Sequence, residues 1–108
     1  MVKNVQESRD FLKSLAKASR QKRKSLLKSA TAKQLKALEE ISFNVAKNTV
    51  PLKKCHIKKI IRGGYKKALI TCAKRKGSLE AKRKIFMQRG GFLQYIIPAA
   101  LMYLQKHL

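Results

Sequence analysis

The sequence predicts an all-α protein of four or five short, loosely packed helices. Apolar residues recur at the three- and four-residue spacing of an amphipathic helix, as in Leu35, Leu38, Ile41 and Val45. Serine, threonine and glycine stand where such segments begin and end. The chain has 108 residues and no Trp, so its core is expected to be aliphatic and thin.

Residues 1–30 are expected to form a basic arm that is partly helical or disordered. Nine Lys or Arg lie between Lys3 and Lys28, against Glu7 and Asp10. Such a segment either folds as it binds phosphate groups or forms an ordinary solvated helix face. Both interpretations remain open from the sequence.

Residues 31–91 are expected to form a basic helical domain. Thr31 and Gln34 have the spacing of a capping box, which predicts a helix start. This helix carries two of the acidic residues and is the predicted core helix. Pro51 disfavours a helical conformation in the residue before it, so we expect a turn at 48–51.

Beyond Leu52, the apolar residues keep one helical phase through two adjacent glycines. The predicted apolar face consists of Ile57, Ile61, Tyr65, Ala68, Leu69 and Cys72. We expect one bent helix that is locally weakened by Gly63 and Gly64; two helices meeting at a hinge are the alternative.

A second basic helix is predicted over residues 79–89. Gly77 and Ser78 are expected to act in succession as a C-cap and an N-cap. Ile85 and Phe86 form the predicted buried side of the helix, and the Gly90–Gly91 pair ends it.

Residues 92–108 are expected to form an apolar C-terminal tail. The stretch from Phe92 to Leu104 is uncharged, and only Gln94 and Pro98 interrupt its apolar residues. Thirteen helical residues span roughly 20 Å, less than the hydrocarbon core of about 30 Å, so this stretch should not cross a bilayer alone. Packing on the other helices, self-association and insertion into one leaflet are the alternatives. The residues assigned to this role are Phe92, Leu93, Tyr95, Ile96, Ile97, Leu101, Met102, Tyr103 and Leu104.

The charge balance predicts a polyanionic partner. The chain has 27 Lys plus Arg against five Asp plus Glu, a formal net charge of +22. Self-repulsion at this charge opposes compaction, and a polyanion relieves it. Duplex DNA is the expected partner, and RNA, acidic membranes and acidic proteins are alternatives, because charge alone reports sign and not identity.

The predicted phosphate-binding surface lies between Lys53 and Arg89, where Glu80 is the only acidic residue. Lys is far more frequent than Arg, and Lys acts as a flexible point charge, so binding should be nonspecific. The short basic runs also resemble nuclear targeting patches. The residues assigned to the surface are Lys53, Lys54, Lys58, Lys59, Arg62, Lys66, Lys67, Lys74, Arg75, Lys76, Lys82, Arg83, Lys84 and Arg89, with Lys22, Arg23 and Lys24 as an auxiliary site.

The sequence carries no pattern of catalytic groups, so we expect no enzymatic activity and no cofactor. Five carboxylates and two isolated histidines provide no acid and base pair. Cys55 and His56 are neighbours, which point about 100° apart on a helix. Cys55 and Cys72 are expected to be free thiols, and no ligand spacing predicts a metal site. Residues 1–10 show no secretory signal, which favours residence inside a cell or virion.

Four segments resemble a known family: LLKSAT at 26–31, KNTVPL at 47–52, KGSL at 76–79 and RGGFLQYIIPAAL at 89–101. They are similar to small basic proteins of adintoviruses and Maverick or polinton elements, which in turn resemble the precursor of adenovirus core protein X, the source of the Mu peptide. The resemblance implies a virion core protein that condenses viral double-stranded DNA and whose apolar tail is either removed or used at a membrane. The expected location is the virion core and, during infection, the host nucleus, as the short basic runs also indicate.

The resemblance also implies a viral maturation protease as a partner. That protease favours an apolar residue, any residue and then Gly-Gly, a form that Ile61 to Gly64 fit, with cleavage before Tyr65. The second pair, Gly90 and Gly91, fits less well because Gln88 occupies the apolar position. A plain hinge at Gly63–Gly64 and a C-cap at Gly90–Gly91 are the alternative.

Two further functions are consistent with the same charges. One is a membrane-active minor capsid protein, in which the basic helices hold anionic head groups and the tail inserts into the bilayer. The other is an RNA-binding or ribosome-associated basic protein.

Overall fold

The computed structural model describes residues 2–74 and 76–107, and this part of the chain forms helices and no strand. The predicted all-α class is therefore confirmed. The described residues form eight α-helices and one short 3-10 helix: α1 Val2–Glu7, α2 Arg9–Lys17, α3 Arg20–Lys28, α4 Ala32–Ala46, α5 Lys54–Arg62, α6 Lys66–Ala73, α7 Leu79–Arg89, η1 Gly90–Phe92 and α8 Leu93–His107.

The expected number of four or five helices is wrong, because short polar breaks divide the chain more often than the apolar pattern indicates. Ser8 separates α1 from α2, and Ser19 caps α3 by accepting a hydrogen bond from the Lys22 backbone N–H at 3.3 Å. The Ser19 side chain therefore caps its helix, whereas Ser8 begins α2 without a side-chain capping hydrogen bond.

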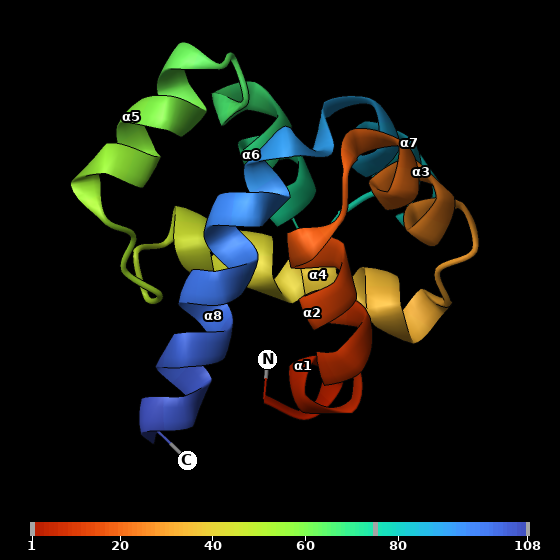
Figure 1. Ribbon diagram of the computed structural model, residues 1–108, viewed down its shortest axis with the longest axis horizontal. Helices are drawn as coiled ribbons and strands as arrows, with labels where there is room; N and C mark the ends of the chain where they lie inside the picture. Colours follow the sequence, from red (N-terminus) through yellow and green to blue (C-terminus); the bar gives the residue numbers. More distant parts are fainter. Residues whose placement is uncertain (1, 75, 108) are drawn as a thin grey trace.

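Helix α4 lies at the centre of the fold, where it contacts α1, α6, α7 and α8. Figure 1 shows it crossing the middle of the molecule, with α5 and α3 on opposite sides. The predicted capping box is present: Gln34 N–H donates to Thr31 Oγ1 at 3.2 Å, and Thr31 N–H donates to Gln34 Oε1 at 2.9 Å. Leu35, Leu38 and Ile41 are buried as the spacing predicts.

A continuous core replaces the expected loose packing. The molecule measures 32 × 29 × 28 Å, and side chains from both ends of the chain meet inside it. The largest fully buried side chains are Phe86, Phe92, Leu12, Leu15, Leu27, Leu35, Leu38, Ile41, Leu93, Ile96, Ile97 and Val5. The two buried phenylalanines supply volume that an aliphatic core alone would lack.

Residues 2–28 form three helices that belong to this core, whereas the sequence indicated an arm. Helix α1 packs on α4, α2 on α8, and α3 on α7. Val5, Leu12, Leu15 and Leu27 are buried. Each helix contributes only one or two fully buried apolar side chains, which explains why the pattern is weak in the sequence.

Residues 54–73 form two helices, so the single bent helix expected here is wrong. Gly64 has φ of +75°, a conformation that favours glycine and ends α5 after Arg62. The α5 half of the predicted apolar face is wrong, because Ile60 is buried while Ile57 and Ile61 are 40% and 56% exposed; the α6 half is confirmed, since Ala68, Leu69 and Cys72 are buried. The turn rotates α6 relative to α5, so that the two helices do not share one phase.

The expected C-cap at Gly77 is also wrong. Helix α6 ends at Ala73 and has an extended C-cap residue, Lys74. Gly77 has φ of +97° and lies in the following link. Ser78 does cap α7 as predicted, since its Oγ accepts a hydrogen bond from the Ala81 N–H at 3.1 Å.

The apolar segment from Phe92 packs back onto the other helices. Phe92, Leu93, Ile96, Ile97 and Leu104 are buried. Tyr95, Leu101 and Tyr103 are partly buried against the same core, and Met102 is exposed. None of the described helices has both the length and the apolar composition needed to cross a bilayer.

Candidate nucleic-acid interface

Almost all of the basic side chains that the structure describes lie on the surface. The exceptions are Lys82, which is buried, and Arg23 and Arg83, which are half-buried. Every helix from α1 to α7 carries at least one exposed Lys or Arg. Positive charge therefore surrounds the folded core on several sides.

The densest group is the α5–α6 cluster, which we define as Lys53, Lys54, Lys58, Lys59, Arg62, Lys66 and Lys67. All seven side chains are exposed. No Asp or Glu occurs in the sequence between Glu40 and Glu80, so the cluster has no acidic residue of its own. Lys66 and Lys67 also line a shallow hollow of the surface, together with Lys74.

Helix α5 is anchored by few contacts and projects from the body of the molecule (Figure 1). Ile60 is its buried residue, and the His56 ring lies 5.2 Å from the Tyr95 ring of α8. The Lys59 ammonium lies 5.8 Å from the same ring, within the range of a cation–π contact. These contacts hold one side of α5 and leave its lysines exposed to solvent.

The basic residues at the starts of α5 and α6 work against the stability of these helices, whereas Lys59 and Arg62 lie in the last turn of α5, where cations are favourable. Lys54 begins α5, and Lys66 and Lys67 begin α6, with no acidic residue in either first turn. The N-terminal end of a helix dipole is positive, so cations there are unfavourable by a few tenths of a kcal/mol up to about 1 kcal/mol each. Helix formation therefore does not explain these lysines.

Two residues assigned to the phosphate surface instead hold the fold together, which corrects the prediction. The Lys82 ammonium donates hydrogen bonds to Glu39 Oε2 and to the Lys74 carbonyl oxygen, and its side chain is only 4% exposed. A buried ammonium in these contacts is not available to an external phosphate. Lys82 lies in a run of basic residues in the sequence, and this is why it was assigned to the phosphate surface and its buried contacts were not predicted.

Arg83 ties α7 to the end of α3. Its Nη1 donates to the carbonyl oxygens of Leu27 and Ala30 at 2.8 and 2.9 Å. Arg83 also forms a bidentate ion pair with the Glu80 carboxylate: Nε donates to Oε2 and Nη2 donates to Oε1, each at 3.0 Å. The last carbonyl oxygens of a helix lack intrahelical donors, and a cationic side chain can supply them. Arg83 therefore caps the end of α3 and joins it to α7.

The other assigned residues have different surroundings. Lys22, Lys24, Lys76 and Lys84 are exposed, whereas Arg23 is half-buried. Arg89 is exposed, and its Nη2 donates to the Gly64 carbonyl oxygen at 2.8 Å. The assignment of Arg75 lies outside the described residues.

The carboxylates neutralise only part of this charge. Glu7 pairs with Lys33 at 2.6 Å, and Glu39 and Glu80 pair with residues of α7. The hydrogen bond from Lys33 lowers the pKa of the Glu7 carboxyl group, and the hydrogen bond from Arg83 lowers that of Glu80. None of these pairs involves the α5–α6 cluster.

The two glycine pairs come together around one side chain, a relationship that the sequence did not reveal. A Cβ atom on Gly63 would lie 2.6 Å from the Tyr65 ring, and one on Gly91 would lie 2.5 Å from the Tyr65 hydroxyl. Gly63 and Gly64 form an exposed turn, while Gly90 and Gly91 are buried in η1. A protease would therefore reach the first pair far more easily than the second.

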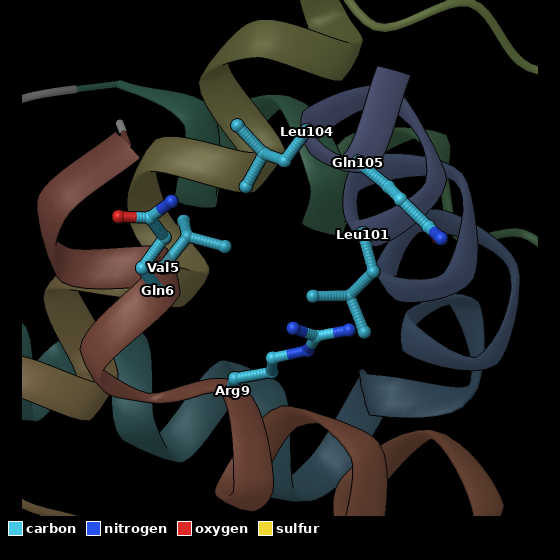
Figure 2. A pocket seen from close by; sticks show the side chains of 6 residues that line it. All are labelled: Val5, Gln6, Arg9, Leu101, Leu104 and Gln105. Atoms are coloured by element: carbon cyan, nitrogen blue, oxygen red, sulfur yellow. The ribbon is translucent and has the colours of Figure 1, made fainter. Parts of the chain in front are cut away.

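One hollow of the surface lies beside the N-terminal helices and is lined mainly by apolar and amide side chains. Figure 2 shows this hollow of about 240 Å³ between the N-terminal helices and α8, with the Arg9 side chain extending toward Leu101. Its lining is otherwise apolar or amide: Val5, Gln6, Leu104 and Gln105. Within the described residues, no group of three His, Cys, Asp or Glu is arranged to hold a metal ion.

Sequence reasoning missed Arg20, which lies beside Arg23 and Arg89 around a small polar pocket. Arg20 and Arg23 have the three-residue spacing of neighbours on one helix face, and this spacing was the available signal. The approach of Arg89 from α7 could not be read from the sequence.

Comparison of the chain with protein-family models, with curated proteins and with solved structures gives no match.

Proposed function

We propose that the protein binds and condenses double-stranded DNA through nonspecific contacts with its phosphates, without enzymatic activity. The observation that carries this proposal is the α5–α6 cluster: seven exposed basic side chains without an acidic neighbour in the sequence from residue 41 to 79. Phosphates of a duplex would supply the charge that the protein lacks, and release of their counterions would drive binding.

The distribution of charge favours condensation over simple coating. Exposed cations occur on α3 and on α5, which lie on opposite sides of a globule 32 Å across (Figure 1). A particle with cations on opposite sides can contact two duplexes at once and reduce the repulsion between them. We further propose that the protein lies in the virion core and, during infection, in the host nucleus.

A matched pair of charge variants tests the proposal. Replacing Lys58, Lys59, Arg62, Lys66 and Lys67 by Gln removes five charges from the α5–α6 cluster. The control replaces Lys3, Lys13, Lys17, Lys36 and Lys47 by Gln, which removes five exposed charges from α1, α2 and α4 and its C-cap. Affinity for a random-sequence duplex and compaction by light scattering are measured for both.

We expect the cluster variant to lose more affinity and to reduce the logarithmic salt slope by about 4 units, since each phosphate contact contributes roughly 0.9. The control should reduce the slope by less than half of that. Equal losses in the two variants would contradict the assignment of the cluster as the main contact surface.

A second candidate is binding to an anionic membrane surface. The observation in its favour is that Ile57, Ile61 and Ile70 are 40%, 56% and 43% exposed beside the cluster. Helices with lysines and exposed isoleucines suit the boundary between head groups and acyl chains. Insertion of the tail has less support, because Phe92, Leu93, Ile96, Ile97 and Leu104 are buried in the core. Vesicle binding that is lost in Ile57→Ser and Ile61→Ser, with duplex binding retained, would favour the membrane candidate.

An RNA-binding role uses the same charges. Competition between a random duplex DNA and a structured RNA at one salt concentration addresses it directly. Preferential binding of RNA would favour that role over the proposed one, because shape and 2′-hydroxyl contacts distinguish the two polymers.

A further inference from the structure

A small polar pocket lies where three junctions of the fold meet: the start of α3, the α5–α6 turn and the α7–η1 junction. Its volume is about 210 Å³. The α2–α3 and α7–α8 links lie side by side in Figure 1, which agrees with this placement. Arg20, Arg23 and Arg89 line the pocket together with Tyr65 and Gly91, and its lining contains no acidic residue.

Arg23, which lines this pocket, also carries an unsatisfied donor. Its Nε is buried and makes no hydrogen bond with the described residues. The same nitrogen lies beside Gly90, where a Cβ atom would be 3.5 Å away, an ordinary van der Waals contact. A buried charged donor without a partner is unfavourable, so an external acceptor would stabilise this arrangement.

Arg89 is held in place from the other side. Its Nη2 donates to the Gly64 carbonyl oxygen at 2.8 Å, and its guanidinium carbon lies 5.8 Å from the Tyr65 ring centre. This hydrogen bond uses one of five N–H donors of the group. Tyr65 is itself confined between Gly63 and Gly91, which fixes the position of this wall of the pocket.

Arginine is the informative residue type in this pocket. The chain contains seven Arg, and three of them line this one pocket, although Lys dominates everywhere else. Guanidinium groups present paired N–H donors that match the oxygens of phosphate, whereas ammonium groups act as point charges. Three guanidinium groups around a small volume also repel one another until an anion enters.

We propose that this pocket binds a single phosphate group. Resting on the proposed function, we assign the source as one backbone phosphate of bound DNA, which the pocket would hold as a fixed anchor among many diffuse lysine contacts. The start of α3 contributes in the same direction, because Arg20 is the first residue of a nine-residue helix and this end of the helix dipole is positive.

The test uses inorganic phosphate as the probe and the full chain as the protein. Binding is followed through the side-chain Nε–H resonances of arginine by NMR, with phosphate titrated at constant ionic strength. Arg23→Lys and Arg20→Lys preserve the charge and remove the paired donors. Arg9→Lys is the matched control, since Arg9 is exposed and lies outside this pocket.

We expect saturable binding of one phosphate, with the largest shift at the Arg23 Nε–H. Arg23→Lys and Arg20→Lys should each weaken phosphate binding about ten-fold, the loss of one charge-assisted paired contact. Arg9→Lys should change it less than two-fold. Non-saturable shifts, or equal effects of Arg23→Lys and Arg9→Lys in folded proteins, would overturn the phosphate pocket.

A second arm with a random duplex distinguishes this inference from the proposed function. Duplex binding should shift the Arg23 Nε–H in the same direction as phosphate does. Tight, salt-dependent duplex binding without that shift would refute the anchor and leave the proposed function intact. Phosphate binding without duplex binding would support the pocket and refute the proposed function together with the assigned source.

Discussion

Lys82 and Glu39 form an ion pair in the interior, between α7 and α4, 43 positions apart in the chain. The Lys74 carbonyl oxygen accepts a second hydrogen bond from the same ammonium group. The pair therefore joins the central helix, the end of α6 and α7. A protein with a large excess of positive charge thus uses one of its few carboxylates to hold a lysine inside.

This pair predicts a large difference between two neighbouring lysines. Lys82→Ala leaves the Glu39 carboxylate without its partner in a poorly solvated position and should destabilise the fold by about 3–5 kcal/mol. Lys84→Ala, at an exposed position, should change stability by less than about 0.5 kcal/mol. Urea denaturation measures both, and similar values for the two variants would contradict the buried pair.

The contact between Tyr65 and Gly91 predicts a steric effect. Gly91→Ala places a Cβ atom 2.5 Å from the Tyr65 hydroxyl and should destabilise the fold by about 1–3 kcal/mol. Adding Tyr65→Phe removes the nearest atom and should restore part of the loss. Thermal unfolding of the single and double variants measures this coupling; strictly additive effects would argue against the contact.

The packing of α8 predicts that truncation to alanine lowers stability at its buried apolar residues and not at its exposed ones. Ile96 is fully buried, whereas Met102 is 60% exposed. Ile96→Ala should cost about 2–5 kcal/mol of stability by leaving a cavity, and Met102→Ala less than about 0.5 kcal/mol. If Ile96→Ala left the unfolding midpoint unchanged, the tail would not be part of the core.

The buried Cys72 predicts a loss of stability at alkaline pH. Burial raises the pKa of its thiol from 9.0 to about 12, while the unfolded chain loses that proton near pH 9. The unfolded state therefore binds fewer protons than the folded state between pH 9 and about 12, and stability falls as the pH rises through this window.

Comparison with Cys72→Ala isolates this effect from the titration of lysines. The unfolding free energy of the unmodified protein should decline more steeply above pH 9 than that of the variant. A thiol reagent at pH 8 provides a second readout, because exposed Cys55 should react quickly and Cys72 only on unfolding. Parallel pH profiles, or rapid reaction of both thiols, would contradict the burial of Cys72.

Local signals were the predictable part of this fold. Thr31 with Gln34, the turn before Pro51 and the Ser78 cap depend on residues within a few positions of one another, and the structure contains all three. The prediction of a single helix across Gly63 and Gly64 was wrong. The apolar residues keep helical spacing in the sequence, although the backbone turns at Gly64. The burial of Lys82 depends on Glu39, a nonlocal partner that spacing does not reveal.

The same distinction applies to the candidate interface. The basic run over α5 and α6 is visible in the sequence, and the structure leaves these side chains exposed. The pocket around Arg23 is assembled from α3, the α5–α6 turn and the α7–η1 junction, so no local pattern could have predicted it.

The most direct test of the proposed DNA condensation is the salt dependence of binding to a random-sequence duplex. With about ten phosphate contacts, the logarithm of the association constant should fall with the logarithm of the potassium chloride concentration with a slope near −9. Fluorescence anisotropy of a labelled duplex measures this slope. A slope near zero, or no association at low salt, would contradict the proposed function.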